Sequence, residues 1–282
     1  MIRFIALLVA ISFYTLYGYA QTLVNDSVSS KKSCDTSGTN SHYLTIGGDG
    51  LKISNKMRDS IRSKRTVNTH FLMFDLGFNA LHDASNYANQ DVQQYLQVPG
   101  NKQNGNLYSL RQGKSINVNI WPVLLDINLL RNRSQKISLY TGAGLQIYNF
   151  RFNKDISHLN NSSPMVIDDS VNFSKNKLAF AYLSVPLMVN FKTKVSSKLW
   201  VTYGLGVIGG YCFDSWTKQI SDERGKQKNH DQFNFQKFNL NLSGEIGLKG
   251  YIRLYGTYQV TNLYQNTMSQ NPYAIGIRFF GV

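Results

Sequence analysis

The sequence predicts an all-β protein, an eight-stranded antiparallel up-and-down transmembrane β-barrel with an irregular N-terminal periplasmic segment. Apolar and polar residues alternate over eight stretches between residues 69 and 280, which indicates strands because successive side chains of a strand point to opposite faces. Aromatic residues are 13% of the 282 residues and prolines number 5, a composition that favours strands. The connections are alternately long and short, as in membrane barrels with tight periplasmic turns and longer outer loops.

The first twenty residues have the pattern of a secretory signal peptide. One positive charge at Arg3 precedes an almost entirely apolar run over residues 4–16, which is too short to span a bilayer as a helix. Small residues at Gly18 and Ala20 predict cleavage before Gln21. We therefore expect residues 1–20 to be removed and the mature chain to be exported. The residue directly after the cut is Gln21 and not a cysteine, so we expect no lipid anchor.

Residues 21–68 form a polar and basic segment that we expect to be mostly irregular and to lie in the periplasm. The stretch 27–41 is rich in Ser, Thr, Asp, Gly, Asn and Lys, a composition typical of solvated chain. An alternative for its last part is a short helix from Ser54, with Met57 and Ile61 on one side, resting on a lipid surface or on the mouth of the barrel.

Residues 69–282 make up the predicted barrel, and each strand is recognised by its alternation. The first strand puts Leu72 and Phe74 on one face and Phe71, Met73 and Asp75 on the other. The predicted strands cover residues 71–79, 110–130, 137–152, 177–192, 199–216, 238–248, 252–261 and 273–280. The long connections cover residues 80–108, 153–176 and 217–232, and the shorter ones 131–136, 194–198, 249–251 and 265–271.

The second strand changes phase at Trp121–Pro122. Its apolar residues are even-numbered up to Ile120 and odd-numbered from Val123 onward. Such a change would turn the apolar side chains to the opposite face unless one strand carries an extra residue. A β-bulge at the proline would absorb that residue, so we expect a bulge there.

The stretch 238–264 predicts a hairpin with a defined register. The predicted pairs across the loop 249–251 are Leu248 with Ile252, Ile246 with Leu254, and Leu242 with Tyr258. This register keeps the apolar rows on one side of the sheet. On the other side, Glu245 lies diagonal to Arg253, at a distance that long side chains can close.

The polar face of the strands decides which side of the sheet points outward. It carries glycines at positions 142, 144, 204, 206, 210, 247 and 276, and the ionisable residues Asp75, Lys237, Glu245, Arg253 and Arg278. Small residues and pairable charges suit a narrow lumen, which an eight-stranded barrel fills with its own side chains. We therefore predict an apolar face toward lipid, no wide pore, and a structural ion network of the five ionisable residues, because an unpaired buried charge is costly. The alternative, with the apolar face inward, is a soluble lipocalin-like carrier.

The charge and the cysteines exclude several other classes. The formal net charge is +14, but the basic residues are spread through turns, loops and strand faces, so we predict no nucleic-acid partner. The expected partners are outer-membrane lipid and lipopolysaccharide. Cys34 and Cys212 are the only cysteines; we expect no disulfide between them, and no metal-ligand spacing and no cofactor motif is present.

No catalytic motif is present either. The sequence lacks Gly-x-Ser-x-Gly, His-Glu-x-x-His and phosphate-loop patterns, so we predict that the protein is not an enzyme. Its histidines, at positions 42, 70, 82, 158 and 230, lie in predicted loops or at a strand mouth, where we expect them to be solvated.

Five motifs follow one another in a recognisable order, at residues 74–79, 140–152, 182–187, 254–258 and 272–279. As an ordered set they resemble the outer-membrane β-barrel family of Bacteroidota, of PorT-like type. The resemblance implies an eight-stranded barrel in the outer membrane, inserted by the barrel-assembly machinery, with the last strand as insertion signal, although the chain ends on Val282 rather than on an aromatic residue. It implies no catalytic residues. The PorT branch of the family serves a secretion apparatus for surface proteins.

Two membrane roles therefore stand beside the carrier. The first is a structural or surface-interaction role through the long loops 80–108, 153–176 and 217–232. The second is a PorT-like accessory subunit of a protein-secretion machine, working through the basic segment 21–68. The partner would be a surface protein in the first case and a secretion-machine protein in the second.

Overall fold

The computed structural model describes residues 43–47, 50–54, 66–159, 165–196, 199–248, 252–265 and 268–279. The chain divides into two units, Met1–Ser41 and His42–Val282, and every described residue belongs to the second. The predicted signal peptide, Cys34 and most of the predicted periplasmic segment lie outside the described residues. Among the described residues, no helix has the length and apolar character needed to cross a membrane.

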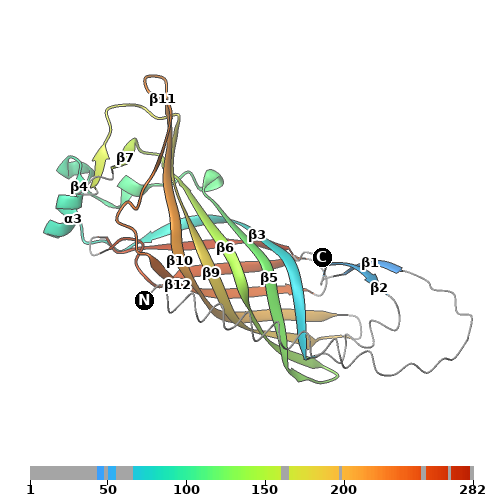
Figure 1. The fold of residues 1–282 in the computed structure, drawn as a ribbon. Coiled ribbons are helices and arrows are strands. Elements are labelled where there is room, and N and C mark those ends of the chain that lie inside the picture. Colours follow the sequence, from blue (N-terminus) through green and yellow to red (C-terminus); the bar gives the residue numbers. More distant parts are fainter. Residues whose placement is uncertain are drawn as a thin grey trace, which may run out of the picture. The chain divides into compact units, whose positions relative to one another are not determined.

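Eight antiparallel strands close into a barrel (Figure 1). They are β3 (Val67–Asp83), β5 (Ile116–Arg131), β6 (Gln135–Arg151), β9 (Lys175–Lys194), β10 (Trp200–Ser221), β12 (Phe238–Leu248), β13 (Ile252–Gln259) and β14 (Gln270–Phe279). Each pairs with the next strand of the barrel, and the ring is closed where β14 pairs with β3. The predicted eight-stranded up-and-down barrel is confirmed.

The apolar face of the strands points outward. The exposed apolar side chains of this face include Leu76, Phe78, Leu183, Val185, Leu187, Leu205, Leu242, Ile246, Leu254, Ile275 and Ile277. Between them, the alternate side chains of the same strands are buried in the lumen, and many of those are polar. An apolar outer band around a polar interior is the arrangement of a transmembrane β-barrel. The lipocalin-like alternative, which requires the reverse arrangement, is therefore wrong.

The register of the predicted hairpin is confirmed. In β12 and β13, Leu242 lies opposite Tyr258 and Ile246 opposite Leu254, and Glu245 is placed diagonal to Arg253. The alternation was long enough here to leave one register that keeps all apolar residues on one face.

The predicted bulge is also confirmed, but it involves both neighbouring strands. The pairing of β5 with β6 shifts between Ile120 and Val123. In β3 the pairing passes from Phe71 to Met73, and Leu72 adopts a positive φ of 54°. As a result Phe71, which we predicted on the polar face, is 55% exposed on the outer face beside Leu72. The proline on β5 offers no N–H for the ladder, and β3 accommodates the same change of phase.

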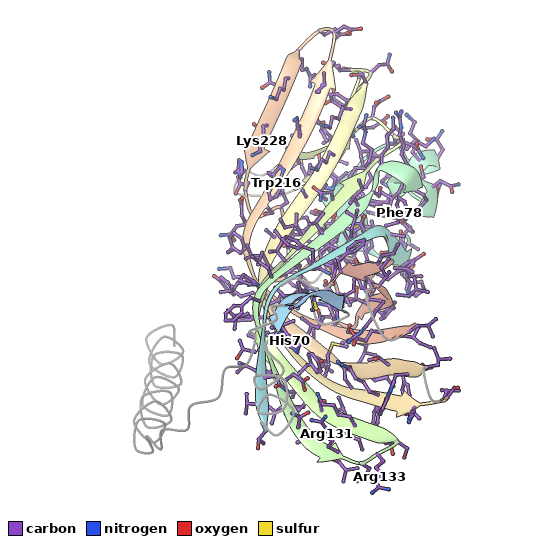
Figure 2. All side chains as sticks on the ribbon, turned by 90° about the vertical axis from the view of Figure 1, so that its right-hand side faces the viewer. His70, Phe78, Arg131, Arg133, Trp216 and Lys228 are labelled. Carbon is purple, nitrogen blue, oxygen red and sulfur yellow. The ribbon has the colours of Figure 1, made fainter. Side chains whose placement is uncertain are left out.

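The two ends of the barrel differ, as the lengths of the connections predict. At the turn end, short connections join β5 to β6 and β9 to β10, and Arg133 lies exposed there (Figure 2). At the loop end, the connections contain α3 (Gln90–Tyr95), β4 (Leu96–Gln97), β7 (Ile156–Leu159), β8 (Met165–Asp168), β11 (Gly225–His230) and the short 3-10 turns η1 (Gly100–Lys102), η2 (Gly105–Tyr108) and η3 (Gln112–Lys114).

One expectation about an irregular segment is corrected, and the N-terminal segment contains a short hairpin. Residues 217–232 are not a loop, because β10 continues to Ser221 and pairs with β11 in a hairpin that projects beyond the barrel. In the N-terminal segment, β1 (Tyr43–Gly47) and β2 (Gly50–Ser54) form an antiparallel hairpin. The alternative of a helix from Ser54 onward falls on residues 55–65, outside the described residues.

Candidate functional site

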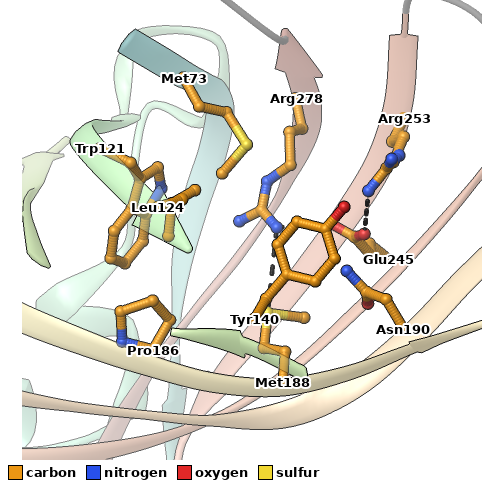
Figure 3. A pocket seen from close by; sticks show the side chains of 10 residues that line it. All are labelled: Met73, Trp121, Leu124, Tyr140, Pro186, Met188, Asn190, Glu245, Arg253 and Arg278. Carbon is orange, nitrogen blue, oxygen red and sulfur yellow. Dashed lines mark hydrogen bonds and ion pairs between the residues drawn. The ribbon is translucent and has the colours of Figure 1, made fainter. Parts of the chain in front are cut away.

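Four of the five predicted lumen residues, Asp75, Glu245, Arg253 and Arg278, meet in one ion network, and Figure 3 draws the last three of them. Arg278 of β14 binds Asp75 of β3 with two nitrogens, Nε to Oδ1 at 2.7 Å and Nη2 to Oδ2 at 2.8 Å. Its third nitrogen, Nη1, donates to Glu245 of β12 at 2.5 Å. Arg253 of β13 donates to the other oxygen of Glu245. All four side chains are buried, and two cations face two anions, so the cluster as a whole is neutral.

The neighbouring strand β5 completes the hydrogen bonding of Asp75. Asn119 and the indole of Trp121 donate to Asp75 Oδ2 at 3.1 and 3.0 Å. A buried carboxylate needs such donors because desolvation of a charge costs more than one ion pair returns. The sequence analysis did not predict either residue as part of the lumen network. Asn119 alternates with apolar residues, which indicates that its side chain points into the lumen. Trp121 lies at the change of phase of the strand, so the alternation did not indicate which face it occupies.

Lys237 does not belong to the network. It is exposed and precedes β12, so it lies at the loop end. Its backbone carbonyl accepts a hydrogen bond from the amide of Cys212 at 2.7 Å. The sequence pattern predicted that Lys237 points inward. In the structure, the first side chain of β12 that points into the lumen is Asn239.

A pair of glycines, Gly77 and the predicted lumen glycine Gly276, leaves room for a tyrosine side chain along the inner wall of the barrel. Gly77 of β3 and Gly276 of β14 are directly paired, with Tyr255 of β13 on one side and Asn117 of β5 on the other. The Tyr255 hydroxyl passes over both glycines and donates to Asn117 Oδ1 at 2.8 Å. A Cβ atom on Gly276 would lie 2.4 Å from the Cα of Gly77. Only glycine leaves room for this arrangement.

A second buried ion cluster includes a histidine that we predicted to be solvated. Asp126 accepts from Lys136 Nζ at 2.8 Å and from the Tyr140 hydroxyl at 3.3 Å, and His70 Nε2 lies 3.6 Å away. His70 is 9% exposed, and its ring stacks on Tyr140 with centroids 5.9 Å apart. The expectation of a solvated histidine is wrong here because β3 begins before His70 and turns it inward.

Between these two clusters the lumen is packed with apolar side chains. Met73, Trp121, Leu124 and Ile208 form a buried hydrophobic cluster. The void beside the ion network has a volume of about 10 Å³, room for about one water molecule. The arrangement is suited to holding the strands together. The charged side chains of the two clusters, in the part of the lumen that the structure describes, are paired with one another rather than free to line an ion path.

At the loop end, the long connections fold into a cap with its own aromatic core. We call this unit the cap; its core side chains are Val92, Tyr95, Leu96, Val98, Leu107, Tyr108, Tyr148, Phe150, Phe152, Ile156, Val166, Leu178, Phe180, Tyr182, Phe233, Phe235, Leu263, Tyr264, Met268 and Ala274. They come from the loops, from the inner faces of β6 and β9 and, for Ala274, from β14, so the cap is packed against the barrel. A small sheet of β4, β8 and β7 stiffens it.

His158 lies within this cap core and was also predicted to be solvated. Its ring stacks on Phe152 at 5.6 Å, meets Tyr108 edge-on at 6.2 Å, and places Nε2 3.3 Å from the Tyr264 hydroxyl. Burial among these rings disfavours the charged form and lowers the pKa of His158 to about 3. The cap therefore contains a neutral histidine at physiological pH.

We expect the cap to loosen on acidification. In the unfolded chain His158 binds its proton near pH 6.5, whereas in the cap it stays neutral down to about pH 3. The unfolded form binds more protons in that window, so cap stability falls as pH drops from 6.5 toward 3, by about 1.4 kcal/mol per pH unit at most. The stability of the cap can be followed by hydrogen exchange of the backbone amides around Ile156, after correction for the pH dependence of the intrinsic exchange rate. His158→Phe should lose this dependence; the same dependence in the variant would contradict the assignment.

Comparison with known proteins adds little to this picture. No family model matches the sequence, and no curated protein matches it. Among solved structures, the chain is similar to the crystal structure of Ail, the attachment invasion locus protein of Yersinia pestis, at 10% identity, over 75% of this chain and 98% of that chain, with a TM-score of 0.28. A likeness of this score is no guide to function, and the PorT-like resemblance of the sequence stays a prediction.

Proposed function

We propose that the protein is an integral outer-membrane barrel with a sealed lumen, whose loop end forms a folded surface for contact with a partner outside the cell. The short turns would lie in the periplasm and the cap outside. The observation that carries this proposal is the filling of the barrel. Two ion clusters and an apolar layer occupy the lumen, and the cap packs over its loop end.

The cap supports a binding role better than mobile loops would. Its side chains are ordered by a common aromatic core, so its surface is preorganised, and preorganised surfaces lose less entropy on binding. One groove on the cap has a volume of about 590 Å³ and is lined mainly by polar side chains. They include Asn101, Lys102, Asn104, Asn106, Asn153, Asp155, Asp168 and Asn172.

A conductance measurement tests the sealed lumen. The full mature chain, inserted into planar bilayers, should give no steady channel steps, and cell fractionation should recover it with the outer membrane. Steady conductance steps would contradict the proposal, as would recovery in the soluble periplasm. Deletion of residues 22–66 keeps β3 intact and should leave the secretion of surface proteins unchanged. Loss of that secretion would instead support the PorT-like accessory role.

A further inference from the structure

Part of the sheet extends past the barrel at the loop end, and its two faces differ. The extension consists of the outer parts of β6 and β9, the end of β10 and the whole of β11 (Figure 1). Its inner face carries Phe150, Leu178 and Phe180, which belong to the cap core. Its outer face continues the face of Leu183 and Val185, which point toward lipid. We call this outer face of the extension the basic face.

A row of four cations crosses the basic face. Arg151 of β6 is paired with Lys177 of β9, Lys177 with Lys218 of β10, and Lys218 with Lys228 of β11. Paired strands lie about 4.8 Å apart, so the row is roughly 14 Å long. Like charges directly opposite each other destabilise a sheet. A row of four in consecutive strands therefore indicates that an anion offsets the repulsion.

Further cations and an aromatic ring surround this row. Lys175 and Lys226 both lie opposite Ile220, two residues along the strands from the row and on the same face. On the other side of the row, Lys177 Nζ and Lys228 Nζ lie 5.9 and 5.3 Å from the ring centre of Trp216. Figure 2 labels Trp216 and Lys228. Lysine over tryptophan is a favourable contact, and it holds both ammonium groups above the centre of the basic face.

Acidic side chains lie at the margins of the basic face rather than within it. Asp214 on β10 is paired with His230 at 2.9 Å, and the acidic residues Asp222 and Glu223 occupy the exposed turn at the tip of the hairpin. Within the described residues, none of the six cations forms an ion pair with a carboxylate; Arg151 Nη2 donates instead to the carbonyl of Ser174 at 2.7 Å.

Lys177 shows how crowded the positive charges are. It lies in the part of β9 beyond the lipid-facing belt. Partial burial and then the charges of Lys175, Lys218 and Lys228 lower the pKa of Lys177 to about 8. A group whose charged form is disfavoured in this way gains from a bound anion, because the anion restores the ammonium form.

The height of the row above the membrane selects the anion. Lys177 is six positions beyond Leu183, the outermost large apolar residue exposed on β9. At about 3.3 Å per residue the two are about 20 Å apart along the strand, or roughly 15 Å in height at a tilt of about 40°. A phospholipid head-group layer is only about 5–8 Å thick. The phosphorylated sugars of lipopolysaccharide extend farther, into the region that the lysine side chains reach.

We propose that the basic face binds the phosphate groups of lipopolysaccharide in the surrounding outer leaflet, with Lys177, Lys218 and Lys228 as the principal ligands. The proposal rests on the outer-membrane location proposed above. The face lies beside the lipid rather than over the lumen, so a ligand anchored in the same leaflet meets it without leaving the membrane. Binding there would fix the projecting hairpin and attach the barrel to its lipid surroundings.

The test compares two variants with equal loss of charge. The full mature chain in detergent micelles is titrated with fluorescently labelled lipopolysaccharide, and with the same material after chemical dephosphorylation, at 150 mM salt. One variant combines Lys177→Gln, Lys218→Gln and Lys228→Gln. The control combines Lys114→Gln, Lys154→Gln and Lys237→Gln, which also lie at the loop end but outside the basic face. Folding of each is checked by its heat-dependent gel mobility.

We expect the first triple variant to weaken binding at least tenfold and the control to change it less than threefold. Wild-type protein should bind dephosphorylated lipopolysaccharide as weakly as the first variant binds the intact form. Equal binding by the first variant, equal weakening by the control, or equal binding of the dephosphorylated form would overturn the proposal. The proposal would also be overturned if the protein bound heparin through the four cations of the row but did not bind lipopolysaccharide. That result would indicate a soluble polyanion as the partner.

Two further measurements keep the outcome decisive. If the triple variant fails to fold, Lys218→Gln alone should still weaken binding, because Lys218 lies between the two other principal ligands, Lys177 and Lys228. Without lipopolysaccharide, the variants should be at least as stable as wild type, since repulsion is removed; a loss of stability would show a merely structural role. Failure of the wild-type protein to insert into membranes would refute the proposed function. If the protein inserts but binds lipopolysaccharide equally well without the lysines of the row, only this inference is refuted.

Discussion

Replacing Arg278 by glutamine should destabilise the barrel by about 3–5 kcal/mol, the usual cost of removing one partner of a buried ion pair. Arg278 binds both carboxylates of the lumen network, so its loss leaves Asp75 without its bidentate partner and Glu245 with Arg253 alone. The network would then carry one uncompensated negative charge. The free energy of unfolding can be measured by urea titration of the refolded protein in lipid vesicles, followed by tryptophan fluorescence.

Two further variants identify the cause. Arg133→Gln removes the same charge at the exposed turn end, where surface substitutions change stability by about 0.5 kcal/mol or less. Adding Asp75→Asn to Arg278→Gln restores the charge balance and should recover part of the loss. If the double variant is as unstable as the two single losses added together, the destabilisation comes from packing and not from an unpaired charge.

Replacing Gly276 by valine should cost about 2–4 kcal/mol, from overpacking of about 1–3 kcal/mol and from a lost hydrogen bond of about 1 kcal/mol. A Cβ atom at this position would lie 2.3 Å from the carbonyl oxygen of Leu76 and 2.4 Å from the Cα of Gly77. The backbone of β3 cannot withdraw from its own ladder, so β14 must shift and Tyr255 must leave Asn117. Valine has a higher strand propensity than glycine. If propensity alone acted at this position, the substitution would therefore stabilise the barrel.

The matched control is Gly209→Val in β10, where a Cβ atom would meet nothing within 4 Å. This variant should be neutral or slightly stabilising, because it reduces the freedom of the unfolded chain without a clash. The urea midpoints of unfolding of both variants, compared with that of the wild type, show whether the close approach of β3 and β14 causes the loss of stability. Equal behaviour of the two would contradict the close approach of β3 and β14.

Much of the barrel could be predicted because its strands are governed by a local rule. The period of two identifies each strand, and in β12 and β13 it also selects the register, since any slip by one residue would turn Leu242 and Ile246 inward. The same rule placed Asp75, Glu245, Arg253 and Arg278 in the lumen. It misplaced Lys237, which lies just outside the strand, where no alternation applies.

Contacts between distant segments were beyond that local rule. The inward turn of His70, the burial of His158 in the cap and the outward Phe71 all depend on which segment packs opposite, and no periodicity records this.

The row of Arg151, Lys177, Lys218 and Lys228 on the surface also depends on contacts between distant segments. Its members are scattered over nearly eighty positions of the chain, and only the pairing of four strands aligns them. Side-chain alternation is a property of neighbouring residues and is written in the order of the chain. Charge clusters and loop cores arise from pairings and packing across long sequence separations, and these exist only once the barrel has closed.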